Sequence, residues 1–443
     1  MTAFFRPFAG PVAALLLSVA GLAASAMPAA AVDIQEVTSP GGIHALLVED
    51  YTNPLIAVKF AFKGAGATAD PEGKAGTANL LSGLLDEGAG DIGSAEFQAK
   101  LDELGVSLSY DASYDGFSGN FRTLVENQDA AFDLLRLSVN APRFDEEPVN
   151  RIRAQILTGI VSNENDPDTL AGKAFRETVF AGHPYGRPVE GTRETLPGIG
   201  KADLEAFRAK GFARDDLYVG VVGAIDGKTL GEKLDEVFGS LPAKADLPPV
   251  PEVQPITGKS VAVALNVPQT VIQLALPGVK RDDPNFFAAY LMNQVLGGGS
   301  FSSRLYQEVR EKRGLAYGVS SFLASYDHTA MLGVSTATRS DKAQESVEII
   351  RQELTRMAED GPTEDELAKA KAYVKGSYAI RNLDSSLAIA STLVGIQLDD
   401  LGRDYIDRRE GLIDAVTMDD VKAMARTLLS VDPTVVTVGP AGA

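Results

Sequence analysis

Residues 297–317 read GGGSFSSRLYQEVREKRGLAY and combine the signals of a loop, a helix and a strand. The three glycines predict a loop that takes backbone angles closed to other residues. A helix is expected to begin near Ser302 or Ser303, because serine is a good N-cap, and to end at Gly314, because glycine suits a helix C-terminus. A strand is predicted over 315–322, with Tyr317 on the same face as the apolar residues two positions before and after it.

Two side chains of this stretch suggest chemistry. Arg304 falls on the first turn of the expected helix, and Tyr317 falls early on the expected strand. A guanidinium and a phenol that converge can both donate hydrogen bonds to one carbonyl oxygen. Such a pair would orient a substrate or stabilise an oxyanion. The alternative, which the residues alone favour, is a surface arginine and a half-buried strand tyrosine.

The same stretch resembles the arginine/tyrosine segment in the C-terminal half of the pitrilysin/insulinase superfamily of zinc peptidases, in particular its short, two-chain bacterial and mitochondrial-processing branch. The matching residues are SRL at 303–305 and REKRGLAY at 310–317. The resemblance implies that Arg304 and Tyr317 hold the substrate backbone across a cleft from the zinc. It also implies a mobile, peptide-contacting loop built on Gly297, Gly298 and Gly299.

The N-terminal segment 1–31 has the features of a secretory signal peptide. Arg6 is followed by an apolar region over about 12–26, and A-x-A cleavage sites occur at 24–26 and 29–31. The alternative is an uncleaved anchor, although this apolar region is short for a membrane span. The chain contains 0 cysteines, which excludes disulfides and attachment through a lipidated N-terminal cysteine. We therefore expect a periplasmic protein without stable membrane insertion after signal cleavage.

The charge balance argues against two classes of partner. The formal net charge is −19, and removal of the signal with its single basic residue, Arg6, makes the balance more negative. Such a chain is repelled by nucleic acid and by anionic lipid. The charge is compatible with attraction of basic peptides, and equally with solubility alone.

A proline-rich segment over 241–257 divides the chain. It has no periodic apolar pattern and is predicted to be a semi-rigid, extended linker. The linker separates an N-terminal domain at 32–240 from a C-terminal domain at 258–443.

The two domains follow the same order of elements: a strand, two helices, a strand after a glycine, and long amphipathic helices. In the first domain these fall at 55–62, 73–85, 94–104, 105–109 and 128–139. In the second they fall at 271–276, 285–296, 302–313, 314–318 and 342–357. This repeat predicts an α+β fold of two homologous domains, each a mainly antiparallel sheet packed with helices. The resemblance implies the same arrangement, with internal pseudo-symmetry over most of the chain.

In catalytic members of the superfamily the helix after the first strand carries H-x-x-E-H, which binds zinc and supplies a general base. Here Asn79 and Gly83 occupy the histidine positions, and Ser82 occupies the glutamate position. The third ligand position, a glutamate on a later helix, falls on Gly159 or Thr158. Amides and hydroxyls are poor zinc ligands and glycine offers no side-chain ligand. No cofactor is therefore expected in this chain, and zinc is expected in a partner.

A relocated active site has little support. The chain has 3 histidines, none with a second histidine at ligand spacing. His183 lies in HPYGRP (183–188), a segment that the superfamily shares, and we expect it to order a loop. Neither a Gly-x-Ser-x-Gly elbow nor a phosphate-binding loop of the form G-x-x-x-x-G-K-[ST] is present.

These observations predict the non-catalytic, substrate-binding subunit of a heterodimeric zinc peptidase. Its partner would be a chain of similar length that carries H-x-x-E-H, and Arg304 and Tyr317 would reach into the partner's zinc cleft to bind the peptide. The alternative is a catalytically inactive peptide-binding or scaffold protein that forms a homodimer.

Overall fold

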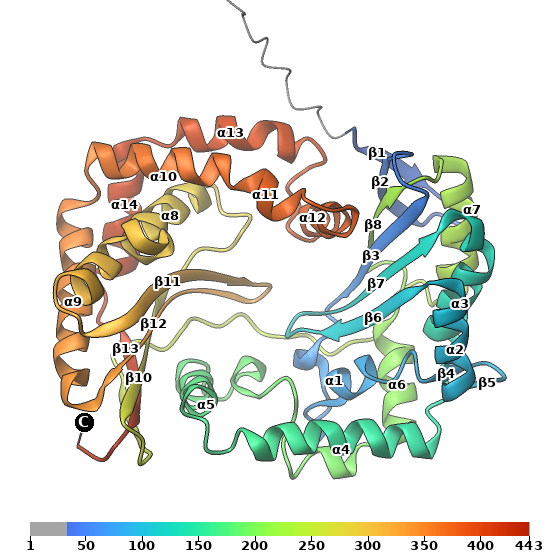
Figure 1. The fold of residues 1–443 in the computed structure, drawn as a ribbon, viewed down its shortest axis with the longest axis horizontal. Helices are drawn as coiled ribbons and strands as arrows, with labels where there is room; N and C mark the ends of the chain where they lie inside the picture. The colour runs from blue at the N-terminus through green and yellow to red at the C-terminus, as the bar shows by residue number, and fades with distance from the viewer. Residues whose placement is uncertain (1–32, 443) are drawn as a thin grey trace, which may run out of the picture. The chain divides into compact units, whose positions relative to one another are not determined.

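The computed structural model describes residues 33–442, which form one compact unit (Figure 1). The predicted signal peptide lies outside the described residues. No helix between residues 33 and 442 is both long enough and apolar enough to cross a membrane.

The first half of the described chain is built on a six-stranded sheet of order β1-β2-β8-β3-β7-β6. The strands are β1 (Gln35–Thr38), β2 (His44–Glu49), β3 (Leu55–Lys63), β4 (Gly88–Ala89), β5 (Ile92–Gly93), β6 (Ser107–Ala112), β7 (Gly116–Leu124) and β8 (Leu217–Gly223). The α-helices are α1 (Thr77–Ser82), α2 (Ser94–Leu104), α3 (Gln128–Asn140), α4 (Glu146–Ser162), α5 (Pro167–Val179), α6 (Lys201–Gly211) and α7 (Gly227–Phe238). The short strands β4 and β5 pair with each other outside this sheet.

The second half repeats this design with a five-stranded sheet of order β11-β12-β10-β13-β9. The strands are β9 (Ser260–Ala264), β10 (Gln269–Pro277), β11 (Ala316–Tyr326), β12 (Thr329–Arg339) and β13 (Thr434–Gly439). The α-helices are α8 (Phe286–Asn293), α9 (Ala343–Asp360), α10 (Glu364–Gly376), α11 (Tyr378–Asn382), α12 (Ser386–Leu398), α13 (Tyr405–Ala415) and α14 (Met418–Leu429).

The two sheets have one topology. The order β2-β8-β3-β7-β6 in the first matches β9-β13-β10-β12-β11 in the second. In each, the only parallel pair joins the equivalent strands, β2 with β8 and β9 with β13. The remaining pairs are antiparallel, as in β3 with β7 and β10 with β12. The predicted α+β fold and its internal repeat are thereby confirmed.

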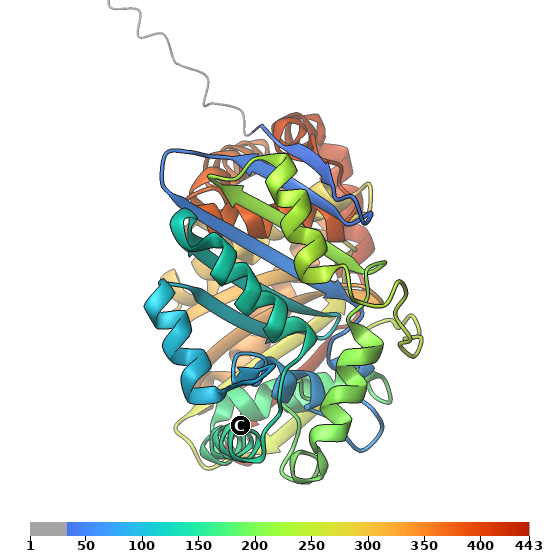
Figure 2. The same cartoon turned by 90° about the vertical axis from the view of Figure 1, so that its right-hand side faces the viewer.

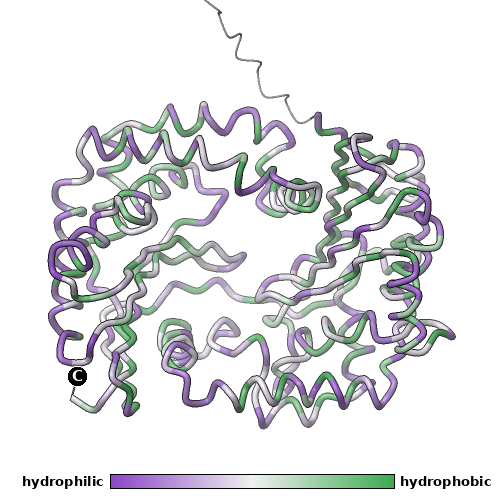
Figure 3. Tube along the Cα trace, in the orientation of Figure 1, coloured by the Kyte–Doolittle hydropathy of each residue, from purple (hydrophilic) through white to green (hydrophobic). Residues whose placement is uncertain are grey.

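Each sheet buries one face under its own helices. In the first half α3 and α7 lie across the sheet (Figure 2), and the core between them is rich in phenylalanine. Phe62 stacks on Phe212 with ring centroids 4.3 Å apart, an arrangement that adds to the free energy of burial. The central strands of the two sheets, such as β3 and β10, are predominantly hydrophobic, whereas the outer helices alternate between polar and apolar residues (Figure 3), the pattern of helices with one buried stripe.

The second face of each sheet carries a helix from the other half. Helix α12, from the second half, packs on β8 and β3, and α5, from the first half, packs on β13 and β10 (Figure 1). A Cβ on Gly220 would lie 2.4 Å from the Ala390 carbonyl oxygen, so the absence of a side chain lets α12 approach β8 closely. On the second sheet, Ala171 of α5 is buried against Val271 of β10 and Val438 of β13.

The halves also meet at their hairpin turns. The Tyr185 hydroxyl donates to the Asp115 carboxylate in the β6–β7 turn at 2.6 Å and accepts from the His328 backbone N–H in the β11–β12 turn at 3.1 Å. His183 accepts from the Tyr185 N–H through Nδ1 and, through Nε2, bonds the Pro251 carbonyl at 2.9 Å. This histidine therefore orders a loop that holds the segment between the halves, which has no helix or strand over 241–257.

Candidate functional site

The triple glycine is part of a helix, which corrects the prediction of a loop with unusual backbone angles. Gly297 and Gly298 belong to a π-helix, η5 (Gln294–Gly298), and Gly299 follows it with φ −83°. None of the three has positive φ. Their role is steric, because a Cβ on Gly297 would lie 2.6 Å from the Ser321 backbone nitrogen of β11. The glycines thus let the helix end against the strand.

The next helix is also irregular. The predicted helix over 302–313 contains a π-helical segment, η7 (Tyr306–Glu311), where a regular α-helix was expected. Leu305 and Val309 are buried on one face, as their spacing predicts. Gly314 has φ +61°, which only glycine adopts readily, and it reverses the chain into β11 as predicted.

The prediction that Tyr317 shares a face with Leu315 and Val319 is wrong. Leu315 and Val319 are buried, whereas the Tyr317 side chain is 90 % exposed. A register shift between Ala316 and Val319, where β11 pairs with β12, inserts one extra residue and breaks the alternation. The buried hydroxyl of Thr338 donates to the Leu315 carbonyl at 2.5 Å beside this bulge.

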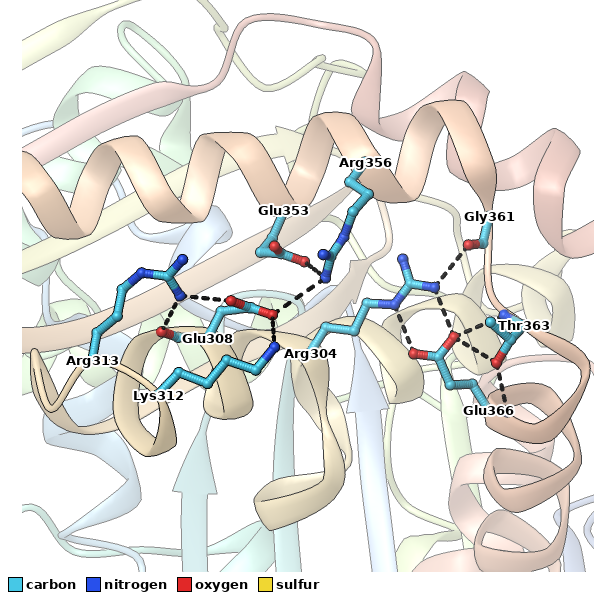
Figure 4. Close-up of polar contacts among 9 residues, drawn as sticks. All are labelled: Arg304, Glu308, Lys312, Arg313, Glu353, Arg356, Gly361, Thr363 and Glu366. Atoms are coloured by element: carbon cyan, nitrogen blue, oxygen red, sulfur yellow. Dashed lines mark hydrogen bonds and ion pairs between the residues drawn. The ribbon is translucent and has the colours of Figure 1, made fainter.

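Arg304 is occupied by an intramolecular ion pair (Figure 4). Its Nε and one terminal nitrogen donate to the two Glu366 carboxylate oxygens at 2.8 and 2.7 Å, and that terminal nitrogen also donates to the Gly361 carbonyl. The Arg304 side chain is only 10 % exposed. Hydrogen bonds from Arg304 and Thr363 lower the pKa of Glu366 to about 2, against the opposing effect of burial. Arg304 therefore ties the start of η7 to the N-terminus of α10.

A second ionic cluster fixes the other end of η7. Glu308 is 8 % exposed and accepts from Lys312 and Arg313, each at 2.6 Å (Figure 4). Arg356 of α9 lies 3.6 Å from Glu308 and donates to Glu353 at 2.5 Å. Burial raises the pKa of Glu308, but the hydrogen bonds and charges of Lys312 and Arg313 outweigh this effect and lower the pKa to about 2. Lys312 and Arg313, which precede β11, thus serve mainly to anchor the helix.

The arginine that lies beside Tyr317 is Arg310. Its guanidinium carbon lies 5.3 Å from the centre of the Tyr317 ring and 4.8 Å from that of Tyr306. No contact in the described chain joins Tyr317 to Arg304. The sequence held a signal for this pair: if the chain reverses at Gly314, residues at similar distances on either side of it come together. The substrate-binding role of Arg304 stays a prediction.

The degenerate zinc positions lie on α1 and just after it. Helix α1 is shorter than the predicted 73–85, because Gly73 and Gly76 have positive φ before it and Gly83 ends it. The Ser82 hydroxyl is used locally and donates to the Asn79 carbonyl at 2.8 Å.

The surroundings of Gly83 and Gly159 show whether a zinc ion fits at the positions where catalytic members of the superfamily carry ligands. A Cβ on Gly83 would lie 2.9 Å from a methyl group of Ile152 on α4, whereas one on Gly159 of α4 would meet nothing within 4 Å. An apolar contact therefore fills the space beside Gly83, and these residues do not fit a zinc ion. Within 33–442 no three histidine, cysteine or carboxylate side chains cluster as a metal site would require.

Asp70 provides the remaining electrostatic feature near α1. Its carboxylate accepts from the Gly76 and Ala78 N–H groups at 2.7 and 2.8 Å, at the start of the helix. Burial raises the pKa of Asp70 to about 6, although these N–H groups and Arg187 oppose the rise. The carboxylate is used to hold the helix N-terminus, a common structural arrangement.

Comparison with known proteins identifies the family. The family model described as "Insulinase (Peptidase family M16)" matches residues 48–193, and the one described as "Peptidase M16 inactive domain" matches residues 198–374. The chain belongs to the insulinase/pitrilysin superfamily. Because the zinc positions lack ligands, it falls in the branch without a catalytic metal site.

Relatives of similar length agree with this assignment. A crystal structure of a peptidase M16 inactive domain from Pseudomonas fluorescens is 28 % identical, with a TM-score of 0.86, and the match covers 93 % of this chain and 98 % of the other. An uncharacterised zinc protease of Streptomyces coelicolor is 28 % identical over 92 % of this chain and 90 % of its own length. A non-peptidase homologue of Helicobacter pylori, YmxG, is 28 % identical over 83 % of this chain and 84 % of its own length.

The names of these relatives include both zinc proteases and a non-peptidase. In this chain the zinc positions hold Asn79, Ser82 and Gly83, and Tyr317 is the part of the predicted substrate-binding pair that is open to solvent.

Proposed function

We propose that this insulinase-like chain is the non-catalytic, substrate-binding subunit of a two-chain zinc peptidase. The observation that carries the proposal is the contrast between its two predicted sites. The positions that would bind zinc hold Asn79, Ser82 and Gly83, while Tyr317 projects into solvent. In this proposal a partner of similar length supplies H-x-x-E-H and the zinc.

Tyr317 and Arg310 are the pair that we propose contacts the peptide. A guanidinium over a phenol ring holds the ring by a cation–π interaction, so Arg310 would fix the direction of the Tyr317 hydroxyl. Both side chains retain hydrogen-bond donors for a peptide carbonyl. Arg304 acts on this pair indirectly, by anchoring the start of η7 through Glu366.

The edge strand β11 adds a backbone surface to this site. It lies at the border of its sheet, so one row of its backbone groups is unpaired within the sheet. An extended peptide can pair with such an edge. Gly297, Gly298 and Gly299 end their helix beside this strand, and we propose that they allow the peptide to approach. We also place the protein in the periplasm, on the predicted signal peptide.

Affinity purification of the tagged mature chain from its native cells tests the assembly, with zinc measured in the purified complex. We expect a stoichiometric partner that carries H-x-x-E-H and one zinc per pair. The chain recovered alone and without metal would support the alternative, a homodimeric peptide-binding or scaffold protein. Zinc bound to the chain alone would contradict both.

A substitution in the assembled pair tests the role of Tyr317. Tyr317→Ala is expected to lower peptide turnover about 10-fold to 100-fold while assembly is retained, because an oriented hydrogen-bond donor is lost. Tyr51→Ala is the matched control, since Tyr51 is also an exposed tyrosine, 62 % exposed, but lies in the first half of the chain. Normal turnover of the Tyr317→Ala pair would contradict the role.

A further inference from the structure

A cavity of about 450 Å³ lies in the second half, among α8, α11, α12 and α13. Three arginines line it: Arg281, Arg381 and Arg409. The lining contains a single carboxylate, Asp399. In a chain with a net charge of −19, this is an unusual gathering of cations around a space large enough for a small ligand.

Arg409 carries most of the argument. Its side chain belongs to a residue only 6 % exposed, yet it forms no ion pair in the described part of the chain. Its recorded hydrogen bond goes from one terminal nitrogen to the Val374 carbonyl at 3.2 Å, and its guanidinium stacks over Tyr378 at 4.1 Å. A buried cation normally has a counter-ion, because the loss of hydration otherwise costs several kcal/mol.

The contrast with Arg304 shows what Arg409 lacks. Both arginines are about equally buried, but Arg304 is matched by two hydrogen bonds to Glu366. Arg409 keeps most of its five N–H donors without a protein acceptor in the described residues. A planar guanidinium of this kind is suited to a carboxylate that binds through both oxygens.

The other two arginines line the same cavity. Arg281 lies over the Phe286 ring at 4.2 Å and donates to the Tyr405 hydroxyl. Arg281 and Arg409 both oppose the rise in the pKa of Tyr378 that burial causes, so both cations act at this side chain. Arg381, which is exposed, donates to the Tyr373 hydroxyl at 2.6 Å and forms the third cationic side of the cavity.

Aromatic and aliphatic side chains form part of the remaining walls, alongside the polar Asn382, Ser391 and Thr392. Phe286 and Tyr290 stack with ring planes 12° apart, and Ile396 contributes an aliphatic surface. Pockets that combine aromatic walls with a few convergent polar groups are typical of small-molecule sites. A bare inorganic anion would leave the aromatic surface without contacts.

We propose that this cavity binds a carboxylate that is attached to an apolar group, with Arg409 as its principal partner and Arg281 and Arg381 beside it. The chemistry is shared by a free aromatic acid and by the C-terminus of a peptide that ends in an apolar residue. This site is separate from Tyr317, and the proposal does not depend on the proposed function.

Titration calorimetry of the mature full-length chain tests the proposal with two matched pairs of probes. The first pair is 3-phenylpropionate and 3-phenylpropionamide, and the second is a tetrapeptide ending in phenylalanine with either a free carboxylate or a C-terminal amide. We expect the carboxylates to bind and the amides to bind at least about tenfold more weakly. Tighter binding of the free acid or of the peptide would identify the source of the carboxylate.

Variants locate the binding within the cavity. Arg409→Gln and Arg381→Gln are each expected to weaken binding at least about tenfold. Arg381 is exposed, so its variant remains informative if Arg409→Gln fails to fold. Arg339→Gln is the control, because this exposed arginine pairs with Asp341 elsewhere. The proposal is overturned if no carboxylate binds, if the amides bind equally well, or if Arg381→Gln and Arg339→Gln behave alike.

Discussion

Equivalent segments of the two halves differ in regularity. In the first half α2 is a regular helix, Gly105 reverses the chain with φ +64°, and β6 pairs with β7 without a register shift. In the second half the corresponding helix contains π-turns, Gly314 reverses the chain with φ +61°, and β11 begins with a bulge. The turn is therefore shared, and only the second segment departs from ideal geometry on both sides of it.

The difference shows how one topology can yield two surfaces. Without the bulge, period-2 alternation would place Tyr317 with buried Leu315 and Val319. The extra residue turns the tyrosine outward, where it is 90 % exposed. Bulges and π-turns are frequent at functional sites, and here the ion pairs of Arg304 and Glu308 hold the irregular helix in place.

The largest expected effect comes from removing the anchor of the irregular segment. Glu366→Gln leaves Arg304 buried without a counter-ion and is expected to cost about 3 kcal/mol of unfolding free energy, at the low end for a buried pair because Glu366 is 29 % exposed. Urea unfolding measures this cost. Asp341→Asn, in an exposed pair, should change the free energy by less than about 0.5 kcal/mol. If Glu366→Gln and Asp341→Asn changed the unfolding free energy equally, Arg304 would not anchor η7.

The same pair has a defined pH dependence. The pKa of Glu366 is lowered to about 2 in the folded chain, below its ordinary value of about 4.5. Its stabilising contribution is therefore fully present above pH 4.5 and is lost as the pH falls toward 2. The difference in unfolding free energy between the native chain and Glu366→Gln should shrink over that range.

Placing the zinc-ligand residue types of the superfamily at positions 83 and 159 should have opposite effects on the stability of the fold. Gly83→His is expected to destabilise the fold by about 1–3 kcal/mol, because its Cβ would lie too close to Ile152. Gly159→Glu is expected to stabilise it by up to about 1 kcal/mol, because the space there is open and glycine is a poor helix former. The double variant should not acquire stoichiometric zinc. Zinc measured at one equivalent would mean that the pocket is retained.

Removing the hydroxyl beside the bulge should have a moderate effect. Thr338→Val deletes the buried donor to the Leu315 carbonyl and is expected to cost about 1–2 kcal/mol. Thr427→Val, at an exposed hydroxyl that bonds its own helix, is the control and should cost less than about 0.5 kcal/mol. A cost no greater than that of the control would mean that this hydrogen bond does not stabilise the bulge.

The smallest effect tests whether the two turns are equivalent. Gly105→Ala and Gly314→Ala each place a Cβ at positive φ, with nothing else within 4 Å. Each should cost about 1 kcal/mol, from the backbone conformation alone. If the costs of Gly105→Ala and Gly314→Ala differed by more than about 1 kcal/mol, the two turns would not be structurally equivalent.

Periodicity and turn chemistry were sufficient to predict the repeated architecture. The repeated order of elements predicted α2 at 94–104 and placed the start of α3 at Gln128, and the glycine at 314 was correctly assigned to the reversal. The loss of the zinc ligands could also be read directly, because ligand chemistry depends on residue type.

The details of the candidate site depended on contacts that local patterns do not encode. The bulge in β11 is set by pairing with β12, and the partner of Arg304 lies on another helix at Glu366. The triple glycine suggested unusual angles, whereas the real constraint is the approach of β11. Arg310 was overlooked because a one-dimensional match draws attention to shared residues and does not show which of them face one another.

Each sheet has one face covered by a helix from the other half, α12 on the first sheet and α5 on the second. This arrangement affects the order in which the chain can complete its fold. The strands that α12 covers are all made before residue 224, but α12 itself begins at Ser386. Leu46 and Val222, which α12 buries, have no cover from it until nearly the whole polypeptide has been synthesised. The first half is thus a late-maturing unit during translation, and a polypeptide cut at the linker would present an uncovered apolar strip to chaperones and proteases.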